Sequence, residues 1–185
     1  RVGGPHPYVR CNAAGPRQVQ DHVGRWRLVL RERLLRFDGG TPSLRLAVVA
    51  GPAPASANSA SVTSVLRGAR ADLVVVLGSV GDDVRRARAN LEAFAAAELP
   101  VLLLAGGRDE EVVLDEALDG LSAAARPLVI DTRGLRAVSV GPVLLALLSG
   151  SRDGMDARSA GGCGYHPDDL AELEQALGAA SSGGR

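Results

Sequence analysis

The apolar positions in the middle of the chain alternate between two spacings. Three runs are almost continuously hydrophobic, as buried strands of a parallel sheet are, and they occupy residues 44–49, 72–77 and 100–104. Each run is followed by a stretch whose apolar residues recur every three or four positions, which predicts helices over 56–70, 84–98 and 110–125. Strands that alternate with helices in this way predict βαβ units and an α/β fold with a layered sheet.

The pattern changes after the third predicted helix. Three short β runs follow at residues 128–131, 135–140 and 143–148, with short connections rich in turn-forming residues. Consecutive strands joined by tight turns predict antiparallel pairing. A last helix is predicted to begin at Pro167, with apolar positions at Leu170, Leu173 and Leu177.

A further amphipathic helix is predicted before the first strand, over residues 17–38. Its apolar residues are three or four positions apart and form one stripe, made of Val19, Val23, Trp26, Leu30, Leu34 and Phe37. The two glycines after Asp38 end the pattern, as glycines commonly do at the end of a helix. The stripe either packs on the sheet, forms an assembly face for another subunit, or binds a membrane surface.

The composition fits one α/β domain. A chain of 185 residues is long enough for one core, and 46% of its residues are hydrophobic. Residues 1–16 hold three Pro and three Gly, and the C-terminal tail is rich in Ser and Gly. We therefore expect an extended arm over residues 1–16, a domain over 17–178 with its core at 44–150, and a flexible tail over 179–185.

Charge and hydropathy argue against two classes of partner. All 21 residues counted as Lys or Arg are arginines, which is typical of a GC-rich bacterial genome, and 21 acidic residues balance them. A net charge of zero does not indicate a nucleic-acid partner. No apolar run reaches the roughly 20 residues that a transmembrane segment requires.

The two cysteines, Cys11 and Cys163, lie near opposite ends of the chain. Their spacing does not match that of metal ligands. In an exported protein they would form one disulfide, and in a cytosolic protein they would be two free thiols. Because the chain starts at Arg1 rather than Met, we favour a processed, extracytoplasmic protein of the periplasm, cell surface or medium, with a cytoplasmic location as the alternative.

The residues after the three predicted parallel strands are arranged like the motifs of a known family. They read Val-Val-Ala-Gly-Pro at 48–52, Leu-Gly-Ser-Val-Gly-Asp at 77–82 and Ala-Gly-Gly-Arg-Asp at 105–109. In order and strand context they resemble the motifs Asp-x-His, Gly-Asp-x-x-Asp and Gly-Asn-His-Asp of the calcineurin-like metallophosphoesterases. The resemblance covers residues 44–150 and implies that family's layered α/β fold.

The same resemblance implies that most metal ligands have been lost. Ala50 and Pro52 replace the aspartate and histidine of the first motif, and Ser79 replaces the bridging aspartate of the second. Gly107 and Arg108 replace the asparagine and catalytic histidine of the third. Alanine, proline and glycine side chains offer no ligand atom, and arginine repels a cation. The chain therefore resembles a degenerate metallophosphoesterase, and we expect neither a metal nor another cofactor.

Only Asp82 and Asp109 survive from the motifs, and both have a structural explanation. Asp109 precedes two glutamates and a helix, so we predict that it is the N-cap of that helix. Asp82 or Asp83 is predicted to cap the helix that starts near Val84. A turn at the two glycines before Arg108 that binds an anion is the functional alternative.

Two function classes follow from these residues. We expect a non-catalytic pseudoenzyme that acts as a structural or interaction protein, self-assembling or part of an exported complex. The partner would be a second copy or another protein, not a nucleic acid. The alternative is a phosphoesterase or anion-binding protein that uses Asp82, Arg108 and Asp109 together with groups from another chain.

Overall fold

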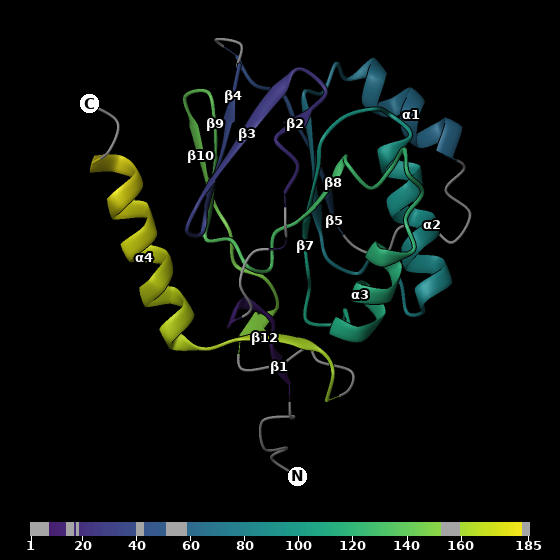
Figure 1. The fold of residues 1–185 in the computed structure, drawn as a ribbon. Helices are drawn as coiled ribbons and strands as arrows, with labels where there is room; N and C mark the ends of the chain where they lie inside the picture. The colour runs from purple at the N-terminus through teal and green to yellow at the C-terminus, as the bar shows by residue number, and fades with distance from the viewer. Residues whose placement is uncertain are drawn as a thin grey trace.

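A four-stranded parallel sheet lies at the centre of the structure (Figure 1), a computed structural model that describes residues 8–13, 17, 19–39, 43–50, 59–152 and 160–182. Its strands, in spatial order, are β5 (Leu46–Ala50), β6 (Leu73–Leu77), β7 (Val101–Leu104) and β8 (Val129–Asp131). Its helices are α1 (Ser59–Gly68), α2 (Val84–Ala95) and α3 (Glu111–Asp119). The alternation of strands and helices confirms the predicted α/β class.

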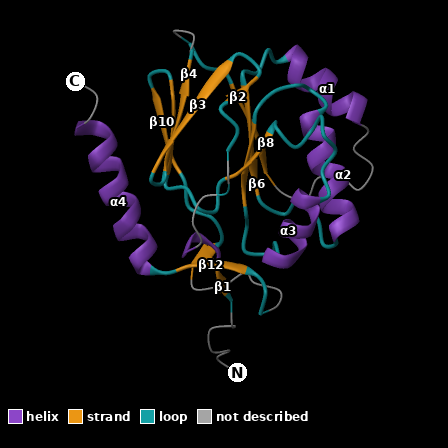
Figure 2. Ribbon diagram, in the orientation of Figure 1, coloured by secondary structure: helices purple, strands orange, loops and turns teal. Residues whose placement is uncertain are grey.

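A second, five-stranded sheet packs on the other side of the parallel sheet. Its spatial order is β10 (Val143–Ala146), β9 (Ala137–Val140), β4 (Leu34–Asp38), β3 (Trp26–Arg31) and β2 (His22–Val23). The β4–β9 pair is parallel and the other pairs are antiparallel. Figure 2 shows the resulting layers: three helices, the parallel sheet, the second sheet and, beyond it, α4 (Pro167–Ser182).

A small third sheet joins the two ends of the described chain. It consists of β1 (Val9–Arg10), β12 (Cys163–Tyr165) and β11 (Ser151–Arg152), and both pairs of strands are parallel. The 3-10 helix η1 (Cys11–Ala13) follows β1. Cys11 forms a disulfide with Cys163, with their Cα atoms 5.4 Å apart, so the disulfide alternative is the one the structure contains. Both cysteines are fully buried.

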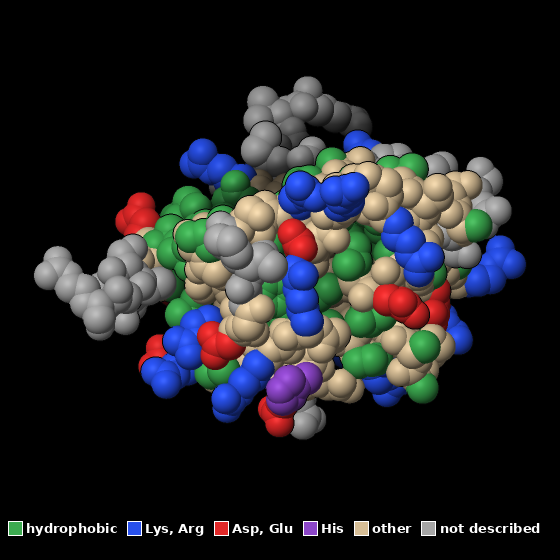
Figure 3. Space-filling model, turned by 90° about the horizontal axis from the view of Figure 1, so that it is seen from above, with side chains coloured by type: hydrophobic (Ala, Val, Ile, Leu, Met, Phe, Trp, Pro, Cys, Tyr) green, Lys and Arg blue, Asp and Glu red, His purple; other side chains and the backbone are tan. Residues whose placement is uncertain are grey.

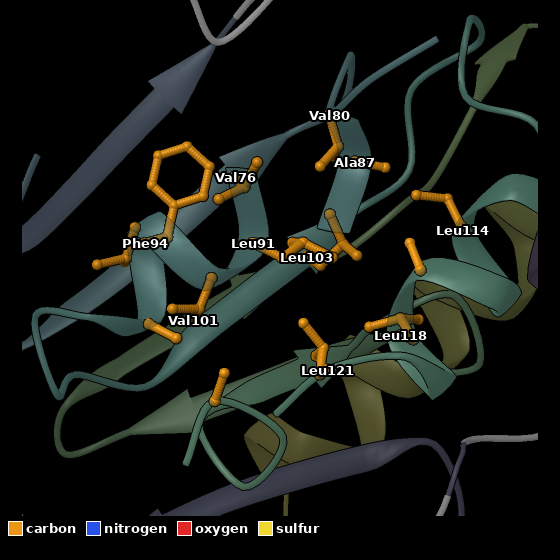
Figure 4. Packing of buried hydrophobic residues seen from close by; sticks show 14 of the residues in the cluster. Val76, Val80, Ala87, Leu91, Phe94, Val101, Leu103, Leu114, Leu118 and Leu121 are labelled. Carbon is orange, nitrogen blue, oxygen red and sulfur yellow. The ribbon is translucent and has the colours of Figure 1, made fainter. Parts of the chain in front are cut away.

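The parallel sheet has a hydrophobic core on each face. Towards the helices, Val76 and Leu103 pack against Leu91, Phe94 and other side chains of α2 and α3 (Figure 4). Towards the second sheet, apolar side chains of both sheets meet in one cluster, which includes Trp26, Phe37, Val75, Leu102 and Val138. The two central strands are thus apolar on both faces, which accounts for their continuous hydrophobic runs.

The amphipathic helix predicted over residues 17–38 is wrong. The structure has β2, β3 and β4 there, joined by two tight turns. Gly24 and Glu32 sit in these turns with φ angles of 55° and 52°, a left-handed conformation that reverses the chain. Trp26 and Leu28 of β3, and Leu35 and Phe37 of β4, are also two positions apart, with an exposed arginine between each pair, and all four are buried between the two sheets.

The assembly face predicted on that helix is wrong as well. Val23, Trp26 and Phe37 are buried in the core between the two sheets. Leu30 pairs with Leu35 across the β3–β4 ladder, so Leu34, one position earlier, lies on the opposite face of the sheet. Val19 packs against the inter-sheet core. The six residues therefore share no exposed face.

Three further expectations need correction. The run at 128–131 is β8, which pairs parallel with β7, and only the next two runs form an antiparallel pair, β9 with β10. In the expected N-terminal arm, residues 8–13 are held in the fold by β1 and the disulfide, while 1–7 and 14–16 lie outside the described residues. In the expected tail, 179–182 belong to α4, and 183–185 lie outside them.

We predict that removing the disulfide strongly destabilises the protein. The bond joins positions 152 residues apart and so restricts the unfolded chain. The Cys11→Ala, Cys163→Ala double variant removes this restriction and raises the conformational entropy of the unfolded state. The free energy of unfolding should fall by about 2–5 kcal/mol. Urea denaturation followed by circular dichroism measures the change, with reduced wild-type protein as the control. Equal midpoints for oxidised and reduced protein would contradict the prediction.

Candidate functional site

In open α/β sheets, ligands gather beyond the carboxyl ends of the parallel strands, which here include the ends of β6 and β7. In this protein the two loops that follow these strands lie backbone against backbone. A Cβ atom added to Gly78 would lie only 2.5 Å from the Cα atom of Gly106, so neither loop has room for a side chain at this point. Gly78 and Ser79 both have positive φ angles, 66° and 54°, which turn the chain towards the neighbouring loop.

The side chain of Asp109 closes the space between these loops. It is 1% exposed, and its carboxylate accepts hydrogen bonds from the backbone N–H groups of Ser79 (2.8 Å), Val80 (2.9 Å) and Gly106 (2.7 Å). Burial raises the pKa of Asp109 above its ordinary value, although these hydrogen bonds and the charge of Arg133 oppose the shift. The carboxylate is a structural acceptor whose oxygens already have partners.

Asp109 is therefore not the helix cap that the sequence predicts. The N-cap of α3 is Glu110, whose side chain makes no capping hydrogen bond. The Asp109 side chain instead crosses to the loop after β6, a partner that is distant in sequence. The sequence predicts that Asp82 or Asp83 caps α2, and the structure confirms Asp83. Asp83 is the N-cap, and its carboxylate accepts a hydrogen bond from the N–H of Arg86 at 2.8 Å.

The other motif positions do not converge on Asp109. Asp82 is exposed and forms an ion pair with the side chain of Arg86. Arg108 is also exposed, and Ala50 lies at the exposed end of β5. Gly107 is half-buried in the loop after β7, and Pro52 lies outside the described residues. The structure thus separates two exposed charged side chains, Asp82 and Arg108, from one buried carboxylate.

The small third sheet covers the loop after β7. The N–H of Gly150 donates to the carbonyl of Ala105 at 2.6 Å, and the N–H of Cys163 donates to the carbonyl of Asp109 at 3.1 Å. The N–H of Glu111 donates to the carbonyl of Gly161, also at 3.1 Å. The disulfide at Cys163 therefore fastens the N-terminal segment over the carboxyl edge of the parallel sheet.

A buried cluster of charged side chains attaches the N-terminal segment and the small third sheet to the second sheet. The sequence patterns did not reveal this cluster. Arg136, 1% exposed, lies 3.2 Å from the carboxylate of the fully buried Asp169, and Arg10 donates to the same carboxylate at 2.9 Å. Arg136 also donates to the backbone carbonyl of Asn12 at 2.7 Å. Asn12 in turn bonds Ser149 through both ends of its side-chain amide. The cluster links β1 and η1 to α4 and to Arg136, the residue directly before β9.

Asp169 depends on these partners for its charge. Burial acts to raise its pKa, but the hydrogen bonds from Arg10 and from the backbone N–H of His166, together with the charges of Arg10 and Arg136, outweigh it. The pKa of Asp169 therefore lies below its ordinary value. The only sequence signal was the acidic pair after Pro167, which indicates a helix start and gives no hint of the distant arginines.

A second charge cluster lies at the end of β8. The guanidinium of Arg133 contacts the carboxylates of Asp131 and Asp115, and Arg17 forms ion pairs with both of these acids. Burial acts to lower the pKa of Arg133, but the two carboxylates raise it above its ordinary value. In the described residues, no group of three or more His, Cys, Asp or Glu side chains is arranged to hold a metal ion.

The comparisons with known proteins found no relative. No family model matches the chain, and neither a curated protein nor a solved structure does so. Within the described part of the chain, no helix is long and apolar enough to cross a membrane. The resemblance to the calcineurin-like metallophosphoesterases therefore stays a hypothesis that depends on the sequence motifs.

We predict that Asp109 contributes to stability rather than to chemistry. Asp109→Ala leaves three backbone N–H groups without their acceptor, so the free energy of unfolding should fall by about 2–3 kcal/mol. Asp82→Ala, at the exposed motif position, is the matched control and should change it by less than about 0.5 kcal/mol. Urea denaturation of both variants measures the difference. Equal stability of the two variants would refute the structural role.

The lowered pKa of Asp169 predicts a loss of stability in acid. Its folded-state pKa lies below the unfolded value of about 3.9, so the unfolded chain takes up the proton first as the pH falls. The contribution of Asp169 is complete above the unfolded pKa and is lost as the pH falls through the folded pKa. Urea midpoints between pH 7 and pH 3 should decline less steeply for Asp169→Asn than for wild type.

The neighbouring Asp168 supplies the control for this pH series. Its side chain is exposed, in contrast to that of Asp169. Asp168→Asn should therefore keep the wild-type dependence on pH. A decline for Asp169→Asn as steep as that of wild type would show that the Arg10–Asp169–Arg136 cluster does not drive the acid sensitivity.

Proposed function

We propose that this chain is a non-catalytic protein with metallophosphoesterase-like layering, which acts as a structural or interaction module. The observation that carries the proposal is the burial and hydrogen bonding of the Asp109 carboxylate. The carboxylate of Asp109 is 1% exposed, and three of its roughly four acceptor positions take hydrogen bonds from backbone N–H groups, which leaves it little capacity to ligate a metal ion. The neighbouring loops touch at Gly78 and Gly106, which leaves little space for a metal ion between them.

The order of the layers supports the proposed likeness to the calcineurin-like metallophosphoesterases. Helices, parallel sheet, second sheet and α4 follow one another in space, and the motif positions fall at the carboxyl ends of β5, β6 and β7. In that family the same ends carry the metal ligands. Here they carry Ala50, Ser79 and Gly107, which supports an ancestral site that has lost its ligands.

The surface supports a protein partner in preference to a nucleic acid. On the face drawn in Figure 3, arginine side chains alternate with acidic and hydrophobic ones. Such a mixture does not form the basic stripe that phosphate backbones select. The Cys11–Cys163 disulfide fits an oxidising, extracytoplasmic compartment.

The alternative function, a phosphoesterase or anion site at Asp82, Arg108 and Asp109, has weaker support. Its three side chains are not directed at one point, because Asp109 is buried between the loops and the other two are exposed. The exposed guanidinium of Arg108 is the one feature that favours it. A partner chain would have to supply the remaining groups.

We predict that the purified protein binds no metal stoichiometrically and hydrolyses no phosphoester. Elemental mass spectrometry on protein prepared without chelator measures the metal content. Hydrolysis of bis(p-nitrophenyl) phosphate with added Mn²⁺ measures the activity, and both should equal the buffer background. Stoichiometric manganese, iron or zinc together with turnover that Arg108→Ala abolishes would overturn the proposed function in favour of the alternative.

A further inference from the structure

Within the described residues, no strand pairs with the outer edge of β5. Among the described strands, β5 pairs only with β6, and its sequence Leu-Ala-Val-Val-Ala is entirely apolar. Natural edge strands generally carry lysine, proline or an inward-pointing charge that prevents pairing with another chain. An edge that lacks all of these presents its free N–H and C=O groups to any strand of suitable shape.

An exposed hydrophobic side chain lies on the edge strand itself. Val48 of β5 is 58% exposed, and Leu77, at the end of the neighbouring strand β6, is 43% exposed. The ladder register aligns Val48 with Val75, two positions before Leu77, so Val48 and Leu77 share a face of the sheet. Contiguous exposed apolar groups mark interaction surfaces.

The hydrogen-bond pattern shows which groups of β5 face outward. The N–H groups of Val74 and Gly78 donate to carbonyls of Pro100 and Leu104, so the even-numbered residues of β6 bond towards β7. The odd-numbered ones, Val75 among them, therefore bond towards β5. In a parallel ladder the partner of a bonded residue directs its own groups away. The N–H and C=O groups of Leu46, Val48 and Ala50 consequently point outward.

The other sheet edges are less suited to pairing. Along β8, Arg17 lies 3.2 Å from the carboxylate of Asp131, so charged groups occupy that edge. β2 has only two residues. β10 is apolar, but its one exposed residue is the small Ala146, whereas β5 exposes Val48, and α4 lies on the same side of the molecule as β10 (Figure 1).

We propose that the outer edge of β5 binds the same edge of a second copy of this chain, in antiparallel register centred on Val48. This register places Leu46 opposite Ala50 and Ala47 opposite Val49, so a large side chain meets a small one at each pair. Val48 lies opposite its own copy, its outward N–H and C=O groups are paired, and no like charges meet. The two four-stranded sheets become one continuous sheet across a two-fold axis.

The proposal names the partner for the interaction role proposed above, and it rests on that role. It also replaces the assembly face that the sequence had placed on residues 19–37. The exposed side chain of Val48 lies at the two-fold axis of this pairing, and Leu77, on the same face of the sheet, is on the neighbouring strand β6.

The experiment is the mass of the full chain in solution, measured by light scattering coupled to size exclusion. Wild type should have twice the chain mass. Val48→Lys places two ammonium groups opposite each other at the two-fold axis, so the mass should fall by half while the circular dichroism spectrum is unchanged. Val112→Lys, on the exposed face of α3, is the matched control and should remain dimeric.

Three results would overturn the proposal. A monomeric wild type at every concentration would exclude the dimer. A dimer that Leu144→Lys dissociates and Val48→Lys does not would place the interface at β10. A series of higher oligomers would indicate an open, head-to-tail contact. A monomer that contains no metal and has no phosphoesterase activity would refute the dimer interface only. The proposed non-catalytic function would not be affected by that result.

Discussion

The carboxylate of Asp109 and the three N–H groups that it accepts determine the shape of the carboxyl edge of the parallel sheet. They join two loops that are separated in sequence by strand β7 and helix α2. The loops lie so close together that Gly78 and Gly106 have no space for a Cβ atom between them. A buried acceptor with satisfied donors stabilises this contact, whereas an empty, ion-sized gap would leave the same donors unpaired. The protein's own backbone thus fills the place where open α/β sheets gather ligands.

The cover above this edge is held by groups from both ends of the chain. The Cys11–Cys163 disulfide joins the N-terminal segment to β12, and Asp169 of α4 meets Arg10 and Arg136 in a buried cluster. Buried ion pairs add little net stability over apolar side chains, but they are costly to break and so favour one arrangement of partners. Their role here is to fix where the terminal segments lie on the sheet.

With the carboxyl edge filled in this way, the proposed interaction role falls to the outer surfaces. The central strands β6 and β7 are covered on both faces, by helices on one side and by the second sheet on the other. The edge strand β5 has its apolar residue Val48 exposed instead, and an uncharged edge can be completed only by water or by another strand. A structural or interaction role and an open sheet edge are therefore consistent with each other.

The spacing of apolar residues predicts the correct element wherever a segment carries only the helical or only the strand spacing. The continuous apolar runs at β6 and β7 and the helical spacing of α2 and α3 predicted those elements, because burial on two faces or on one stripe leaves a distinct pattern. Residues 26–37 carry a helical spacing and a strand spacing at once, and the helical spacing predicts the wrong element. A spacing of three and four competes there with a period of two, and only contact with the parallel sheet decides between them.

The α/β class, the three strand–helix repeats and the absence of ligand-type side chains at Ala50 and Gly107 are all readable from the amino-acid sequence. The two cysteines are readable from it too, but not whether they meet. That Asp109 bonds the loop after β6 rather than capping α3, and that Arg136 meets Asp169, depends on the fold. Strand and helix periods can be predicted because they are local properties of the chain. The partner of a buried polar group is chosen by whichever distant segment the fold brings within hydrogen-bond distance.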